Sequence, residues 1–211
     1  MIPIQELLIF ILAALMLVIT PGPNMIYLIS RSITQGRGAG LISLAGIITG
    51  FTFHVTMVSV GLTAVLFAVP FAYITLKFLG VFYLLYLAFQ AVNPKNQGIF
   101  ETATNLKEDN PAKLFSMGFL TSVLNPKIAV FYLSFFPQFI KPEYGNIFWQ
   151  SIQLGITQVT VSFTVNFLIV LFAARMSIWF AENPFWVKIQ KWFMASILTG
   201  LAFRMALDKT K

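Results

Sequence analysis

Two proline motifs interrupt long apolar stretches of this sequence, about half a chain apart. They are Thr20-Pro21-Gly22-Pro23-Asn24 and Asn125-Pro126-Lys127. Asn followed by Pro predicts a helix start, because the Asn side chain accepts a bond from an unpaired backbone amide and Pro has no amide hydrogen. The amino end of a helix carries partial positive charge and suits an anion such as a carboxylate. In a membrane protein, interrupted helices in matching halves indicate a transport site.

Lys127 stands beside the second interruption and adds a full positive charge. An ammonium within a bilayer needs a partner or a cavity, and the interiors of the expected spans contain no Asp or Glu. Its partner is then solvent, a backbone carbonyl or a bound anion, unless its long stem snorkels to the interface. For the prolines, a kink that only aids helix packing is the structural alternative. We expect the substrate site to contain Thr20, Pro21, Gly22, Pro23, Asn24, Thr121, Asn125, Pro126 and Lys127.

The single histidine, His54, is the candidate for ion coupling, because imidazole changes its charge near neutral pH. A neutral histidine bonded across a helix interface is the alternative interpretation. Gly46 and Gly50, four residues apart, predict close helix packing. Other polar residues either line the same cavity or form ordinary bonds between helices. They are Thr49, Thr52, Ser122, Thr157, Gln158, Thr160, Ser162, Thr164 and Asn166.

The composition predicts an all-α integral membrane protein. Of the 211 residues, 58% are hydrophobic and only 10% are charged, and the mean hydropathy is +0.82, which exceeds what a soluble domain of this size can bury. The net charge is +7, and the Lys and Arg residues that produce it lie mostly in the segments that connect the expected spans. We therefore interpret these residues as a signal of membrane topology and expect no nucleic acid partner. The absence of cysteine excludes thiol catalysis and Cys-ligated metals. Residues 1–19 lack a basic start and a cleavage site, so we expect a retained helix.

Six transmembrane helices are predicted, since a span needs about 20 apolar residues. Their approximate ranges are 3–30, 40–66, 70–92, 112–140, 146–174 and 188–206. The polar linker 93–111 separates a first half, residues 1–92, from a second half, residues 112–211, within one membrane domain. Three spans in each half make the halves inverted, with broken helices 1 and 4. A five-span chain with one re-entrant segment is the alternative.

Basic residues orient the spans. Eight Lys and Arg follow spans 1, 3 and 5 and four lie on the other side, which favours a cytoplasmic place for the first set and both termini outside.

Two longer segments resemble a known family. The run PGPNMIYLISRSITQGRGAGLISLAGIITG resembles the amino-terminal signature of the lysine exporter and homoserine/threonine exporter (LysE/RhtB) family, and GFLTSVLNPKIAVFYLSFFPQF resembles its second signature. The resemblance implies a secondary transporter of the bacterial inner membrane that exports amino acids or close derivatives, driven by an ion gradient. It places the family's motifs on Pro21 to Asn24 and on Asn125 to Lys127.

The absence of acidic residues from the expected spans narrows the class of solute that the protein could export. Export of lysine or arginine favours a membrane carboxylate, and the spans offer none. We therefore expect a neutral or hydroxylated amino acid, or a homoserine-like compound, exported by alternating access with its carboxylate near Lys127.

The expected binding partners of the protein follow from its interpretation as an exporter, and other functions are possible alternatives. The expected partners are the bilayer, the amino-acid-like solute, a coupling proton or sodium ion and, for a homodimer, a second copy. We expect no cofactor and no metal. The alternatives are an exporter of an inorganic ion or other small solute, a membrane scaffold, and an intramembrane enzyme in which a Ser pairs with His54. We predict that the chain is not an enzyme, because no Ser motif accompanies the histidine.

Overall fold

The computed structural model describes residues 1–20, 22–68, 72–93 and 109–207. Its elements are α1 (Ile4–Ile19), α2 (Pro23–Thr34), α3 (Gly36–Ala68), α4 (Ala72–Val92), α5 (Pro111–Val123), α6 (Pro126–Val130), the π-helical turn η1 (Phe131–Phe135), the 3-10 turns η2 (Phe136–Phe139) and η3 (Pro142–Tyr144), α7 (Ile147–Glu182) and α8 (Pro184–Leu207). The described residues contain no strand, which confirms the all-helical prediction. Most of the expected linker, residues 94–108, lies outside the described residues.

Among the described residues, up to four stretches have the length and composition of membrane spans. α3 over Gly36–Gly61 and α7 over Ile147–Arg175 meet both criteria as single helices. α1 with α2, and α5 with the helical run Lys127–Phe139, meet them as bent pairs with angles of 55° and 48°. The predicted breaks in the first and fourth spans are therefore confirmed, whereas the six-span count stays a prediction.

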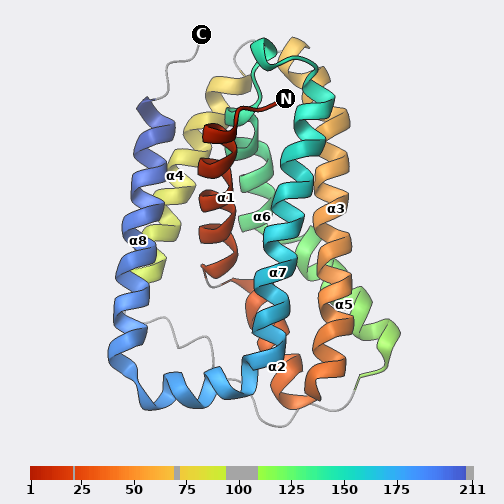
Figure 1. The fold of residues 1–211 in the computed structure, drawn as a ribbon, viewed down its shortest axis with the longest axis vertical. Coiled ribbons are helices and arrows are strands. Elements are labelled where there is room, and N and C mark those ends of the chain that lie inside the picture. Colours follow the sequence, from red (N-terminus) through yellow and green to blue (C-terminus); the bar gives the residue numbers. More distant parts are fainter. Residues whose placement is uncertain (21, 69–71, 94–108, 208–211) are drawn as a thin grey trace.

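The two bent pairs run in opposite directions. In Figure 1, α1 and α2 descend from the amino-terminal end of the bundle, and α5 and α6 ascend toward it. α3 packs against α5 and α7, and α4 packs against α8. The start of α1 and the end of α8 lie at the same end of the bundle. Each break is thus surrounded by other helices.

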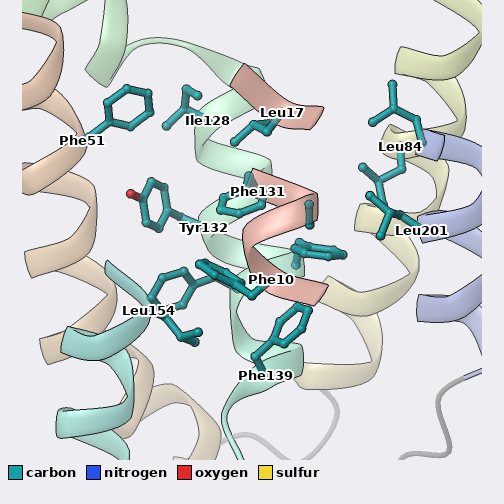
Figure 2. Packing of buried hydrophobic residues seen from close by; sticks show 14 of the residues in the cluster. Phe10, Leu17, Phe51, Leu84, Ile128, Phe131, Tyr132, Phe139, Leu154 and Leu201 are labelled. Atoms are coloured by element: carbon teal, nitrogen blue, oxygen red, sulfur yellow. The ribbon is translucent and has the colours of Figure 1, made fainter. Parts of the chain in front are cut away.

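An aromatic cluster joins α1 to the second bent pair. Phe10 of α1 is fully buried, and its ring centroid lies 5.9 Å from that of Phe131 and 5.2 Å from that of Phe139 (Figure 2). Phe136 lies 5.7 Å away in an edge-to-face arrangement. Buried aromatic pairs of this geometry add about 0.5–1.5 kcal/mol beyond the area that they bury. The cluster therefore holds the first broken helix against the second.

Glycines allow α3 and α5 to touch through their backbones. A Cβ added at Gly46 would overlap the backbone carbonyl of Phe115, and one added at Gly118 would overlap the carbonyl of Ser43. A Cβ at Gly50 would collide with the side chain of Ser122. These contacts confirm the close packing predicted for Gly46 and Gly50.

An acidic residue ties the start of α5 to the end of α2. Asp109, which precedes α5, forms ion pairs with Arg31 of α2 at 2.6 Å and with Lys113 of α5 at 2.5 Å. Gln35 donates to the Asp109 carboxylate and accepts a bond from the Asp109 amide. The hydrogen bond from Lys113, aided by Gln35 and the charge of Arg31, lowers the pKa of Asp109 below its ordinary value of 3.8. The carboxylate is therefore ionised at neutral pH.

The glycine contact can be tested with Gly46→Ala and the matched control Gly38→Ala. A Cβ at Gly46 meets backbone that cannot yield, so we expect a loss of about 1–3 kcal/mol of stability. At Gly38 nothing lies within 4 Å of the added Cβ, so the control should melt at the parent temperature or slightly higher. Thermal melting in detergent measures both variants. Equal melting temperatures for the two variants would contradict the backbone contact.

The pH dependence of the Asp109 interactions follows from the lowered pKa. A carboxyl group with a lower pKa in the folded state stabilises the fold above its unfolded pKa and stops doing so as the pH falls through the folded value. The difference in melting temperature between the parent and Asp109→Asn should therefore be the same at about pH 7 and about pH 5, and should shrink only below about pH 4. A difference that already vanishes at about pH 5 would show that the pKa of Asp109 is raised rather than lowered.

Candidate functional site

The first break separates α1 from α2. The chain leaves the helix at Thr20, whose side chain is buried and donates to the carbonyl of Met16. Gly22 is the residue before α2, and Pro23 is the first residue of that helix, as expected from its missing amide hydrogen. No side chain caps the amino end of α2. Pro21 belongs to the predicted site but lies outside the described residues.

The second break is a capped helix start, as predicted. α5 ends at Val123, and α6 begins at Pro126. The side-chain oxygen of Asn125 accepts a bond of 3.0 Å from the backbone amide of Lys127. This is the N-cap that the Asn-Pro pair predicts.

The two breaks meet inside the bundle. The side-chain amide of Asn125 donates a 3.0 Å hydrogen bond to the side-chain oxygen of Asn24, across 101 positions of the sequence. Asn24 is 7% exposed and Asn125 is 1% exposed. The two motifs are therefore in contact and enclosed within the described structure.

Lys127 closes the end of the first broken helix. Its ammonium donates to the carbonyl of Leu17 at 2.9 Å and to the carbonyl of Thr20 at 2.7 Å. These carbonyls belong to the last turn of α1 and lack the amides that a continuing helix would supply. Lys127 is 6% exposed, so the snorkelling interpretation is wrong. Of the three partners left open by the sequence, backbone carbonyls hold this side chain.

Gly22 makes room for the lysine. A Cβ added at Gly22 would lie 3.0 Å from the Lys127 nitrogen and 3.2 Å from its Cε. The ammonium therefore lies against the amino end of α2 as well as against the carboxyl end of α1. Two of its three N–H groups are used by the described carbonyls.

Two buried polar atoms beside the breaks have no partner among the described residues. They are the side-chain nitrogen of Asn24 and the hydroxyl of Ser122. A buried donor without a partner costs about 1–3 kcal/mol, so these two atoms are candidate hydrogen-bonding groups of the site. Thr121, adjacent to Ser122, is partly buried, and no described contact joins it to Asn24, Asn125 or Lys127.

His54 lies across the helix interface from the second break. Its Nε2 is 3.4 Å from the carbonyl oxygen of Ser122. Its ring stacks on Tyr132 with centroids 5.4 Å apart and an angle of 9°. This geometry agrees with a histidine bonded between helices. Its part in ion coupling stays a prediction.

A buried polar chain extends from Tyr132 along α7. The Tyr132 hydroxyl donates to the side-chain oxygen of Gln158 at 2.5 Å, and the Gln158 amide donates to the Ser162 hydroxyl at 2.7 Å. Asn166 donates to the backbone carbonyl of Ser162. By contrast, the hydroxyls of Thr157 and Thr164 donate to carbonyls of their own helix, to Gln153 and Thr160 respectively.

Tyr132 was missed by sequence reasoning. It lies in the π-helical turn after the second break, a distortion common at functional sites, but a Tyr within an apolar run has no distinctive pattern. Gln158, Ser162 and Asn166 recur every four residues, but Thr160 and Thr164 are also four residues apart. Spacing alone therefore does not distinguish the inward face of α7 from the face that carries these threonines.

Asn125 performs two tasks that substitutions can separate. Asn125→Ala removes both the cap on α6 and the bond to Asn24, so we expect a loss of about 1–3 kcal/mol. Asn125→Ser keeps an oxygen that can cap the helix and should recover part of that loss. Thermal melting of the two variants in detergent measures the difference. A serine variant no more stable than the alanine variant would contradict the capping role.

Comparisons with known proteins identify the family of this chain. The model of the LysE type translocator family matches residues 15–209. A homoserine/homoserine lactone efflux protein of Salmonella typhimurium is 29% identical over 170 residues, 81% of each chain. A protein of Salmonella typhi with the same description has the same identity and coverage.

A more extensive match carries no functional description. An uncharacterized membrane protein of Vibrio cholerae is 28% identical over 201 residues, which are 95% of this chain and 96% of that protein. No solved structure matches the chain. The family match covers nearly the whole sequence and both breaks, and members of this family are transporters. The chain therefore belongs to the LysE type translocator family and is a multi-pass membrane transporter rather than an enzyme.

Proposed function

We propose that the protein exports a neutral or hydroxylated amino acid, or a homoserine-like derivative, and that the solute binds between the two broken helices. The observation that carries this proposal is the buried contact between Asn24 and Asn125, which brings the interruptions into one place. Two relatives are described as efflux proteins for homoserine and homoserine lactone, which supports a solute of this class.

Three groups of this chain favour a carboxylate at the amino end of α2. The helix start lacks a side-chain cap, so its first amides are free to bind an anion. The side-chain nitrogen of Asn24 is buried and unpartnered among the described residues. The Lys127 ammonium lies against Gly22, where it adds a positive charge. Asn125 already caps the start of α6. We therefore propose that Lys127 binds the carboxylate of the solute at the start of α2 rather than at the start of α6.

Release requires the bound state to open toward the other side of the membrane. In the described conformation Thr20, Asn24, Asn125 and Lys127 are all buried. We propose alternating access, in which one bent pair moves relative to the other and exposes the breaks to each face in turn. Coupling to protons through His54 or to sodium, and assembly as a homodimer, stay predictions.

Substitution of Lys127 by Met tests the carboxylate role. Homoserine has a carboxylate, whereas its lactone has only a neutral ester. We expect Lys127→Met to abolish counterflow of labelled homoserine in proteoliposomes and to reduce that of the lactone less, because only the carboxylate loses a charge partner. The exposed lysine Lys188 gives the control Lys188→Met, which should transport both compounds like the parent.

The comparison of the two compounds separates binding from folding. Lys127 also caps α1, so its loss weakens the fold for any solute. An equal loss of both activities would therefore assign Lys127 to structure alone, and full retention of homoserine transport would remove it from the site. Ion-stimulated flux without any amino acid would favour the alternative of an inorganic-ion exporter.

A further inference from the structure

The antiparallel course of the bent pairs places the start of each beside the end of the other. The start of α5 and the end of α2 lie at one end of the bundle (Figure 1). There Asp109, just before α5, forms an ion pair with Arg31, near the end of α2. At the opposite end, Glu6 in the first turn of α1 meets Lys141, just after η2. In both places the acid comes from the start of one broken helix and the base from the end of the other.

The breaks lie between these two ion pairs. At about 1.5 Å per residue, Arg31 is roughly 10 Å along α2 from Asn24, and Glu6 is roughly 16 Å along α1 from Leu17. A solute bound at the breaks would therefore have one ion pair on each side of it along the bundle axis.

The two pairs differ in strength. The Arg31–Asp109 distance is 2.6 Å, with side chains only 11% and 8% exposed, and Gln35 adds two hydrogen bonds to Asp109. The Glu6–Lys141 distance is 3.6 Å, with side chains 24% and 36% exposed. Removal of one partner from a buried pair is far more costly than from an exposed pair. The described conformation is thus held more firmly at the Arg31 end.

One feature of the Arg31–Asp109 pair favours its separation. The Nε of Arg31 is buried and has no partner among the described residues, so the closed arrangement leaves one donor unsatisfied. Separation of the two charges into water would restore that bond. An ion pair, unlike an apolar contact, can open to water and close again at little cost once it is hydrated.

We propose that the Arg31–Asp109 and Glu6–Lys141 pairs are the two gates of the transporter, each of which must separate for its face to open. This inference rests on the alternating access of the proposed function. The described conformation is the one in which the Arg31 gate is firmly closed.

The chain contains no cysteine, so a single introduced thiol can report access to the breaks. Ser122→Cys is a suitable reporter, because Ser122 is fully buried next to the second break and its hydroxyl has no described partner. A charged, membrane-impermeant methanethiosulfonate is added to either face of sealed vesicles that contain no solute, and the labelling rate is measured. The reporter without other changes should label slowly from the Arg31 face.

Loss of one gate should shift access toward its own face. Asp109→Asn should raise labelling from the Arg31 face at least about tenfold and lower it from the opposite face. Glu6→Gln should do the reverse with a smaller change, because its pair is longer and more exposed. The exchange Arg31→Asp with Asp109→Arg should return labelling toward the slow parent rate.

Lys113 provides the matched control. It also pairs with Asp109, but both residues belong to the second bent pair, so Lys113→Met does not connect the two broken helices and should label at the parent rate. Unchanged rates in both Asp109→Asn and Glu6→Gln, or an increase from the same face in both, would overturn the proposal. If Asp109→Asn does not fold, Glu6→Gln and the charge exchange decide it. Because no solute is used, failure of the gates is distinct from failure of amino acid export.

Discussion

A backbone carbonyl within a bilayer must find its hydrogen bond inside the protein, because no water reaches it. The carboxyl end of α1 presents such carbonyls near the middle of the bundle, and Lys127 of the other broken helix supplies the donor. The same contact solves the opposite problem of a buried ammonium without a carboxylate. The rest of the site depends on these hydrogen bonds between the Lys127 ammonium and the carboxyl end of α1.

The neighbouring residues follow from that contact. Gly22 lacks a side chain where the lysine passes, and Asn125 holds the start of α6 so that Lys127 faces α1. The hydrogen bond between Asn24 and Asn125 also joins the start of α2 to the start of α6. The Asn24–Asn125 bond and the two bonds from Lys127 to α1 each join one half to the other, so movement of one bent pair relative to the other has to break these bonds. A solute that replaces some of them can therefore favour one conformation over another.

The parts of the site that sequence reasoning recovered depend on local chemistry. The Asn-Pro start, the broken spans and the glycine contact of α3 all follow from residues close in the chain, and the structure confirms them. The partner of Lys127 was left among three possibilities, since its carbonyl acceptors lie 110 and 107 positions away. Tyr132 was not recognised, because its π-helical turn and its bond to Gln158 arise only when α7 packs beside it.

The sequence by itself determined that the chain is helical and apolar enough for a membrane, where its helices break, and which family it belongs to. These properties depend on residue type and on neighbours within a few turns. The tertiary structure alone decided that the two breaks touch, that a lysine caps a helix end, and that acid and base meet at both ends of the broken pairs. Such contacts join distant residues, so they depend on how helices cross and pack, which no local pattern specifies.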